Sequence, residues 1–541
     1  MSDISNESKV LLVEEDQSLL HKSTVKDYVC ETRPWYTVPH LLHLNFVLFL
    51  VCLSSTNNGY DGSVLNGLQS LNYWQDYFGH PSGARLGALS NAVVFGVMIC
   101  FPVGPYLADH IGRRFCIGFG QALTVIGSVI QGVTGMGIHC AEGFCTDRDR
   151  HFVWFFFARI IVGFGAGAAV IGSSSLISEL SYPTHREVAT FAFNVFWYSG
   201  AVLASWVVFG TRNLDSDYAW RIPSFIQGAL PLIQVLTIFL VPESPRFLIA
   251  QGRIEQAESV LKKYHIGNSV EADKLAFIQF ELAEIQTAIE NEKLTTNSSY
   301  MDFIRKKNFH KRLFLVCFVP VIMQLAGNGL VSYYLNKVLN SIGITGETEQ
   351  LIINACLMTY NFVCSAVICS LLSLFKRRTL FITCLSGMLI SYIIWTILSA
   401  INQQRHFEDK SLANGVLAMI FLFYLAYNIG VNGLPYLYMT EILPYSHRAK
   451  GINIFQFVQE VLLVYNGFVN PVAMAAIEWK YYIVYCCLLC VELVVVILFF
   501  PETSGRSLEE VGEVFGDEVT KVHLNSYDSK AKHSIEHVES T

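Results

Sequence analysis

Charged residues are scarce in this chain of 541 residues. Asp, Glu, Lys and Arg together make up 15% of it, whereas a soluble domain carries about 25% charged residues. Apolar residues make up 52%, and the mean hydropathy is +0.41. This composition excludes an ordinary soluble domain and predicts a membrane protein.

An excess of basic charge is also lacking. The formal net charge is -7, so we expect no nucleic-acid surface. There is no Gly-x-x-x-x-Gly-Lys-Ser/Thr loop, which argues against transport driven directly by ATP. The 15 histidines are scattered along the chain rather than grouped as metal ligands, which argues against a membrane-embedded enzyme. We therefore expect no metal, no cofactor and no enzymatic activity.

The cysteines do not form a disulfide framework. Most of the fourteen lie in apolar runs such as residues 486–490, where a thiol behaves as a small hydrophobic side chain. Only Cys140 and Cys145 share a polar loop, and a disulfide between them stays open. The polar start of the chain lacks a cleavable signal pattern and is expected to be a cytosolic tail.

Twelve apolar stretches are long enough to cross a bilayer. Because they are continuous rather than alternating, they predict helices and not barrel strands. The fold class expected is an all-α membrane protein with twelve transmembrane helices in two pseudo-symmetric six-helix halves. The expected spans lie near 41–69, 85–108, 115–137, 152–177, 188–209, 221–241, 313–339, 350–375, 379–400, 412–438, 451–472 and 481–500.

The remaining segments complete the expected domain organisation. A tail, 1–40, precedes the first half, 41–241, and a linker, 242–312, with short amphipathic helices joins it to the second half, 313–500. A second tail covers 501–541.

Basic residues alternate between loops and predict the orientation. By the positive-inside rule, both termini and the linker face the cytosol, so the sequon at Asn297 is not expected to be glycosylated. The contrast is incomplete, since Arg148 and Arg150 fall in an outer loop. The inner-side residues are Arg113, Arg114, Arg186, Arg305, Lys306, Lys307, Lys311, Arg312, Lys376, Arg377, Arg378, Arg448 and Lys450.

The two halves share an internal repeat. The pairs Glu179/Arg186 and Glu441/Arg448 have the same spacing and lie 262 residues apart, after the fourth and tenth spans. A Pro-Glu-Ser motif at 242–244 recurs as Pro-Glu-Thr at 501–503, 259 residues later. Duplicated halves are typical of secondary transporters, which hold their solute near the midplane between the halves.

Five motifs carry a resemblance to a known family. They are Asp109-His-Ile-Gly-Arg-Arg114, Arg159-Ile-Ile-Val-Gly-Phe-Gly165, Pro242-Glu-Ser-Pro-Arg246, Glu441 through Arg448, and Pro501-Glu-Thr-Ser-Gly-Arg506. With them the chain resembles the sugar porters of the major facilitator superfamily from about residue 40 to 515. It is most similar there to fungal permeases for lactose and other disaccharides, through residues 57–69 and 448–451.

Charged residues at the inner helix ends are predicted to form a gate. Charge-assisted pairs between them can latch the two halves together and close the inner side. The alternative is that they are solvated surface charges, which their duplicated spacing argues against. The predicted gate residues are Asp109, Arg113, Arg114, Glu179, Arg186, Glu441 and Arg448.

Two charges lie deeper in the spans. Counted along their helices, Asp61 and Arg159 have similar depths and can pair. An isolated charge in a membrane costs at least a few kcal/mol, so such residues usually have a partner and a function. The resemblance implies that Asp61 accepts the coupling proton and that Arg159 controls its protonation. The alternative is a permanent ion pair in an uncoupled facilitator.

A sugar site needs amides for the hydroxyl groups and an aromatic face for the ring. The resemblance departs at Met323, which replaces the first of two glutamines. Glu460 replaces an aromatic or amide residue; it can bind a hydroxyl, take part in proton transfer or be a protonated packing residue. The predicted substrate-binding residues are Asn194, Trp197, Gln324, Asn328, Asn361, Tyr436, Gln459 and Glu460.

Packing is the competing interpretation for polar residues in the spans, because an interhelical hydrogen bond contributes only about 0.6 kcal/mol. We expect Glu492 to be structural. The glycines at 163, 165 and 167 are expected to allow close helix packing, since no strand precedes them as in a dinucleotide site.

The resulting prediction is a monomeric sugar transporter of the plasma membrane, surrounded by lipid, that works by alternating access. It is expected to couple protons to uptake of a disaccharide such as lactose, or of a hexose. The alternatives are an uncoupled hexose facilitator, a carrier of a polyol or quinate-like solute, and a nutrient sensor, although a sensor usually has longer tails.

Overall fold

The computed structural model describes residue 33, residues 35–136, 147–294, 299–371, 375–407 and 409–504, and residue 515. These residues are almost entirely helical, and none of them forms a strand. Cys140, Cys145 and Asn297 lie outside the described residues.

Within the described ranges, eleven helical segments are long and apolar enough to cross a membrane. The last of them, Lys450–Phe499, contains two helices, α21 (Tyr445–Ile477) and α22 (Tyr481–Phe499), separated by the 3-10 turn η6 (Glu478–Lys480). The predicted all-α fold with twelve spans is therefore confirmed. Several helices extend a turn beyond the predicted stretches, because helical hydrogen bonding continues past the apolar run.

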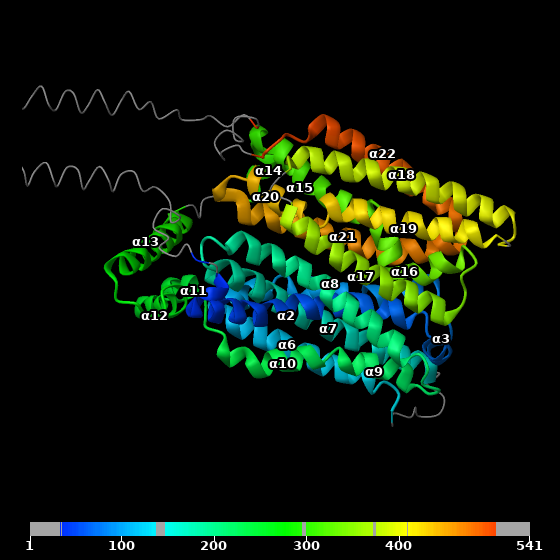
Figure 1. Ribbon diagram of the computed structural model, residues 1–541, viewed down its shortest axis with the longest axis horizontal. Helices are drawn as coiled ribbons and strands as arrows, with labels where there is room; N and C mark the ends of the chain where they lie inside the picture. The colour runs from blue at the N-terminus through cyan, green and yellow to red at the C-terminus, as the bar shows by residue number, and fades with distance from the viewer. Residues whose placement is uncertain are drawn as a thin grey trace, which may run out of the picture.

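The first half forms one layer of the molecule and the second half the other (Figure 1). The first half contains α2 (Pro39–Leu68), α3 (Asn72–Phe78), α4 (Gly83–Cys100), α5 (Gly104–His110), α6 (Arg113–Gly132), α7 (Asp147–Leu180), α8 (Arg186–Thr211), α9 (Tyr218–Ile226) and α10 (Ala229–Thr237). The second half contains α15 (Lys307–Leu325), α16 (Asn328–Asn340), α17 (Glu347–Leu371), α18 (Arg377–Gln404), α19 (Lys410–Gly430), α20 (Leu434–Ile442), α21 and α22.

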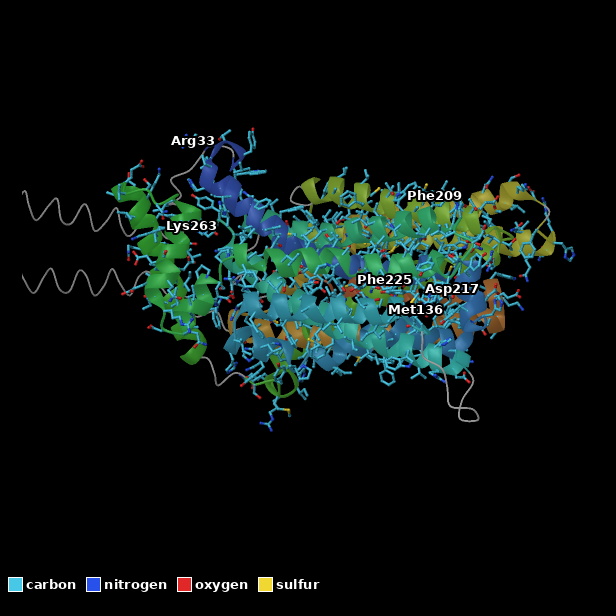
Figure 2. The ribbon with its side chains drawn as sticks, turned by 90° about the horizontal axis from the view of Figure 1, so that it is seen from below. Arg33, Met136, Phe209, Asp217, Phe225 and Lys263 are labelled. Carbon is cyan, nitrogen blue, oxygen red and sulfur yellow. The ribbon has the colours of Figure 1, made fainter. Side chains whose placement is uncertain are left out.

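The interval between the halves also contains helices. They are α11 (Pro245–Ala250), α12 (Ile254–His265), α13 (Ala272–Leu294) and α14 (Asp302–Arg305). In Figure 1, α11, α12 and α13 project from one end of the bundle, far from α3 and α9. We call this the linker end and the other the opposite end. Figure 2 places Arg33 and Lys263 at the linker end and Asp217 toward the opposite end.

Small residues bring helices of the first half close together. A Cβ atom on Gly163 of α7 would lie 2.0 Å from the carbonyl oxygen of Val93 in α4. One on Gly165 would lie 2.4 Å from the carbonyl oxygen of Gly120 in α6. The prediction that these glycines serve helix packing is confirmed.

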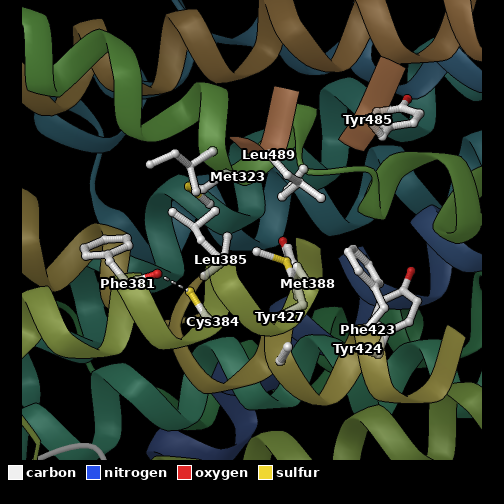
Figure 3. Packing of buried hydrophobic residues seen from close by; sticks show 14 of the residues in the cluster. Met323, Phe381, Cys384, Leu385, Met388, Phe423, Tyr424, Tyr427, Tyr485 and Leu489 are labelled. Atoms are coloured by element: carbon white, nitrogen blue, oxygen red, sulfur yellow. Dashed lines mark hydrogen bonds between the residues drawn. The ribbon is translucent and has the colours of Figure 1, made fainter. Parts of the chain in front are cut away.

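The core of the second half is rich in aromatic and sulfur-containing side chains. Figure 3 shows Phe381, Cys384 and Met388 of α18 with Tyr427 of α19 and Leu489 of α22. The Cys384 thiol donates a hydrogen bond to the carbonyl oxygen of Phe381. This core holds α18, α19 and α22 together. It thereby supports the helices of the second half that line the cavity.

The seventh span is broken between α15 and α16. Gly327 has φ +99°, and a Cβ atom there would lie 2.2 Å from the hydroxyl oxygen of Tyr392. The Tyr392 hydroxyl donates to the carbonyl oxygen of Gly327 (3.1 Å). Only glycine accommodates both the backbone conformation and the close approach. The break separates Gln324 from Asn328, and transporters often have such broken helices near their solute.

Candidate functional site

A cavity of about 390 Å³ lies between the two halves. Side chains of α2, α4, α7 and α8 line it from the first half, and α15, α16, α17, α19, α20 and α21 line it from the second. Its volume falls within the range of small-molecule sites. All eight predicted substrate-binding residues line this cavity: Asn194, Trp197, Gln324, Asn328, Asn361, Tyr436, Gln459 and Glu460.

Several lining residues were not predicted from the sequence. They are polar and aromatic side chains that sit among apolar residues, where they fit the hydrophobic pattern of a span and give no separate signal. The additional residues include Tyr198, Ser332, Tyr333, Tyr424, Tyr427 and Asn432. Together with the predicted residues they make the wall rich in hydroxyl and amide groups, which suits a polyhydroxylated ring.

Asn361 occupies the end of a hydrogen-bond chain that crosses between the halves. The Tyr198 hydroxyl of α8 donates to Oδ1 of Asn428 (3.0 Å), and Nδ2 of Asn428 donates to Oδ1 of Asn361 (3.1 Å). Nδ2 of Asn361 is buried and has no hydrogen-bond partner within the described part of the chain. This amide is thus held in place while its donor stays available to a solute.

The other predicted amides are held to different degrees. Nδ2 of Asn328 donates to the Tyr427 hydroxyl (3.1 Å), and the Tyr436 hydroxyl donates to Oε1 of Gln459 (3.3 Å). The amide of Gln324 makes no hydrogen bond to any described residue. Their contact with a sugar stays a prediction.

Trp197 is positioned by a close crossing of α2 and α8. A Cβ atom on Gly59 would lie 1.8 Å from the carbonyl oxygen of Trp197, and one on Gly200 would lie 1.8 Å from that of Thr56. A Cβ atom on Gly62 would lie 3.3 Å from the Trp197 ring. The glycines of α2 therefore make room for the indole at the cavity wall.

Asp61 and Arg159 are close in depth but do not form the predicted direct ion pair. Asp61 is 0% exposed, and its Oδ1 accepts a hydrogen bond from Nε2 of Gln227 (2.7 Å), whereas its Oδ2 has no partner among the residues that the structure describes. Arg159 lines the cavity, and its Nε donates to the carbonyl oxygen of Leu89 (3.1 Å). The two charges interact only through space. Depth along a helix does not specify direction around it, and Gln227 of the sixth span faces the carboxylate instead.

The charges at the linker end form a network within the first half. Nε of Arg113 lies 3.1 Å from Oε2 of Glu179, and Nη2 of Arg113 lies 3.1 Å from Oδ1 of Asp109. The Glu243 carboxylate accepts the backbone N–H groups of Arg113 (3.0 Å) and Arg114 (3.2 Å). The first backbone N–H groups of a helix have no acceptor within that helix. Glu243 supplies one at the start of α6 and so caps it.

The second half repeats this network. Nε of Arg377 lies 3.3 Å from Oε1 of Glu441. Glu502 accepts the backbone N–H groups of Arg377 (2.9 Å) and Arg378 (3.1 Å) at the start of α18, and the Thr503 hydroxyl donates to Glu441 (2.5 Å). The sequence repeat is therefore a repeat of structure.

These pairs do not form the predicted latch between the halves. Arg113 and Glu179 both belong to the first half, and Arg377 and Glu441 both belong to the second. The physical reason is that each repeat unit carries its own acid and base on neighbouring helices, which satisfy each other. The remaining gate residues, Arg186 and Arg448, lie at the starts of α8 and α21.

The halves are instead joined at the opposite end by side-chain amides. Nδ2 of Asn66 in α2 donates to Oδ1 of Asn354 in α17 (3.1 Å), and Oδ1 of Asn66 accepts a backbone N–H of α16 (3.2 Å). Nε2 of Gln69 donates to a backbone carbonyl of α16 (3.0 Å), and the Gln69 carbonyl accepts from Asn336 (3.1 Å). We call Asn66, Gln69, Asn336 and Asn354 the amide clasp.

Breaking the amide clasp is expected to open the opposite end. Asn66→Ala removes two hydrogen bonds between the halves, each contributing about 1 kcal/mol. We expect the population open at that end to rise about thirtyfold, measured as the distance between spin labels on α3 and on the start of α17. Asn45→Ala is the matched control, because the side chain of Asn45 bonds to Leu41 of α2 and to no other described residue. An unchanged distance distribution would show that the clasp does not hold the halves.

The linker is anchored to both halves. His265 of α12 lies 2.9 Å from Oε2 of Glu281 in α13 through Nδ1, and 3.2 Å from the Leu180 carbonyl at the end of α7 through Nε2. On the other side, Nε2 of His447 in α21 lies 2.9 Å from Oδ2 of Asp302 in α14. The helices α12 and α13 are thus fastened to the first half, and α14 to the second.

The His265 anchor is expected to weaken at alkaline pH. Burial alone lowers the pKa of His265, but the Glu281 carboxylate and the Leu180 carbonyl outweigh this, and the pKa is raised above its usual value. A raised pKa in the folded state stabilises docking fully below the unfolded pKa of about 6.5, and this stabilisation is lost as pH rises through the folded pKa.

Hydrogen exchange of α12 and α13 between about pH 6 and pH 9 tests this expectation, after correction for the intrinsic pH dependence of exchange. Protection should fall with rising pH in the natural protein, while His265→Gln should show weaker protection that does not vary with pH. Equal pH dependence in both proteins would contradict it.

Comparisons with known proteins agree with this architecture. The family model described as "Sugar (and other) transporter" matches residues 47–515. The high-affinity glucose transporter of Kluyveromyces lactis is 24% identical over 530 residues, covering 94% of this chain and 92% of that protein. The low-affinity glucose transporter HXT3 of Saccharomyces cerevisiae is 24% identical over 533 residues, covering 95% and 89%.

A solved structure has the same fold. The xylose transporter XylE of E. coli, in a partially occluded inward open conformation, superposes with a TM-score of 0.71 at 20% identity, covering 86% of this chain and 99% of that one. Another structure of XylE is described as that of a proton:xylose symporter. The chain thus belongs to the "Sugar (and other) transporter" family, the sugar porters of the major facilitator superfamily, and is a multi-pass membrane transporter rather than an enzyme.

Proposed function

We propose that this protein carries a hexose across the membrane together with a proton, by alternating access. The observation that carries the proposal is the cavity between the halves, whose wall combines amides, tyrosines and Trp197 from both halves. Such a wall offers donors and acceptors to the hydroxyl groups and an apolar face to the ring. The glucose transporters among the relatives support a hexose as the solute.

Proton coupling is assigned to Asp61 and Arg159. The Asp61 carboxylate is buried behind the wall, and its charge is balanced through space by Arg159, which lines the cavity. A solute that displaces the Arg159 guanidinium weakens this balance, and a buried carboxylate that loses its counter-charge takes up a proton. Solute binding and protonation are in this way linked. Symport by XylE, whose fold is similar, supports this assignment.

The linker end is assigned to the cytosol of a monomer in the plasma membrane, with both termini on the cytosolic side. The clustering of basic residues supports this orientation. The closed amide clasp at the opposite end supports an inward-facing state. The solute reaches the cavity from outside when the clasp opens and leaves it past Asn194 and Tyr436 on the linker side.

A disaccharide is the second candidate solute, favoured by the motifs at 57–69 and 448–451. Purified protein in liposomes distinguishes the candidates through uptake of labelled glucose, xylose and lactose, with and without an inward proton gradient. We expect glucose to accumulate only with the gradient. Uptake that is equal with and without the proton gradient would indicate a facilitator. Faster uptake of lactose than of glucose would indicate the second candidate. The proposal is overturned if no saccharide moves; transport of a polyol or quinate alone would then indicate a different carrier.

A further inference from the structure

Two charged side chains line the cavity, Arg159 of α7 and Glu460 of α21. They differ in how their charge is balanced. Arg159 is 2% exposed, donates to the Leu89 carbonyl and interacts with the buried carboxylate of Asp61. Its positive charge is therefore offset within the first half.

Glu460 has no comparable partner. Its carboxylate makes no hydrogen bond and no ion pair with any residue in the described ranges, although it is only partly buried and lines the cavity. The titratable groups within its electrostatic range are the phenols of Tyr333 in α16 and Tyr436 in α20. Both phenols are neutral at physiological pH, so they do not offset a carboxylate. Glu460 is thus an acidic side chain of the cavity wall that no basic residue of the described ranges offsets.

An uncompensated carboxylate distinguishes solutes by their charge. A cationic solute favours the ionised form of Glu460 and is held by it, whereas an anionic solute disfavours that form, and both effects are strengthened in a site shielded from water. The hydroxyl oxygens of Tyr333 and Tyr436, which also line the cavity, can accept a hydrogen bond from an ammonium group. A neutral sugar obtains only a hydrogen bond from Glu460.

We propose that Glu460 makes this cavity selective for sugars that carry a protonated amine. A hexosamine binds more tightly than the corresponding neutral hexose, and a uronate, which carries a carboxylate, binds more weakly. This inference rests on the proposed function, since it assigns a preferred solute class to the same cavity.

Equilibrium exchange in proteoliposomes tests the proposal without any influence of membrane potential. Exchange of labelled glucose is inhibited with unlabelled glucose, glucosamine or glucuronate at about pH 6, where the amine is protonated. We expect glucosamine to inhibit at about one tenth of the glucose concentration and glucuronate to require about ten times more. Because these are ratios within one preparation, differences in expression cancel.

Substitutions then assign the effect to one side chain. Glu460→Gln keeps the shape of the side chain, and we expect glucosamine and glucuronate then to inhibit at about the same concentration as glucose. Glu460→Asp keeps the acidic group, so glucosamine should still inhibit best and glucuronate least. Glu492→Gln is the matched control, because Glu492 of α22 is a buried carboxylate that does not line the cavity. Equal inhibition by all three sugars in the natural protein, or unchanged ratios in Glu460→Gln, overturns the proposal.

A protein that does not transport glucose at all can be distinguished from one that lacks the proposed charge selectivity. If the natural protein exchanges no glucose, the three sugars are titrated into purified protein by calorimetry. A glucosamine preference that Glu460→Gln removes still supports the charge selectivity, whereas absence of any preference, or of any binding, overturns it. If Glu460→Gln does not fold, Glu460→Asp and the natural protein decide: both must favour glucosamine over glucuronate, and the proposal is overturned if either does not.

Discussion

Asp61→Asn is expected to abolish uphill sugar accumulation and leave sugar exchange intact. One proton moving through about 100 mV supplies about 2.3 kcal/mol, enough to concentrate a neutral sugar roughly fortyfold. Asparagine cannot ionise, so the expected accumulation ratio falls to about one. It keeps an oxygen that can accept the hydrogen bond from Gln227, so the packing around it is preserved.

The measurement is labelled glucose uptake into proteoliposomes under a proton gradient and a membrane potential, alongside exchange at equilibrium. Glu492→Gln serves as control, because it also neutralises a fully buried acid but one in the second half, away from the cavity. It should accumulate sugar as the natural protein does. Fortyfold accumulation by Asp61→Asn would exclude Asp61 as the coupling group.

Asn361→Leu is expected to weaken glucose binding about thirtyfold. The substitution removes the free Nδ2 donor at the cavity wall and leaves Nδ2 of Asn428 without its acceptor. The affinity falls because a sugar hydroxyl group is left unpaired in the complex, which costs about 2 kcal/mol and corresponds to that factor. Leucine has a similar size, so the cavity is not enlarged.

Calorimetry with purified protein measures this affinity. Thr359→Val on the same helix is the control, because Thr359 bonds to Trp206 and to its own helix and does not line the cavity. It should bind glucose within about twofold of the natural protein. An equally small change in Asn361→Leu would show that this amide does not contact the sugar.

The twelve spans were predictable because a membrane helix can be recognised from the length and hydropathy of its sequence alone. The cavity was predictable in part, since amides such as Gln324 and Gln459 stand out against an apolar span. Tyr198 and Asn428 were not identified, because a tyrosine within a span resembles a packing residue. Their importance appears only when α8 and α19, from different halves, are brought together.

Pairing partners were the least predictable feature. Depth suggested that Asp61 meets Arg159, yet the direction around each helix decides the contact, and Gln227 is what the carboxylate meets. Similarly, Glu179 and Glu441 were expected to reach across to the other half. Each has an arginine on a neighbouring helix of its own half, and a nearer partner is favoured over a distant one.

The split anchoring of the linker has a consequence for control of the transport cycle. With α13 fastened to one half and α14 to the other, the distance between these two helices changes whenever the bundle rocks. An antibody fragment or regulatory protein that binds both helices would slow the transport cycle. It would do so from the protein surface, without competing with the sugar for the cavity.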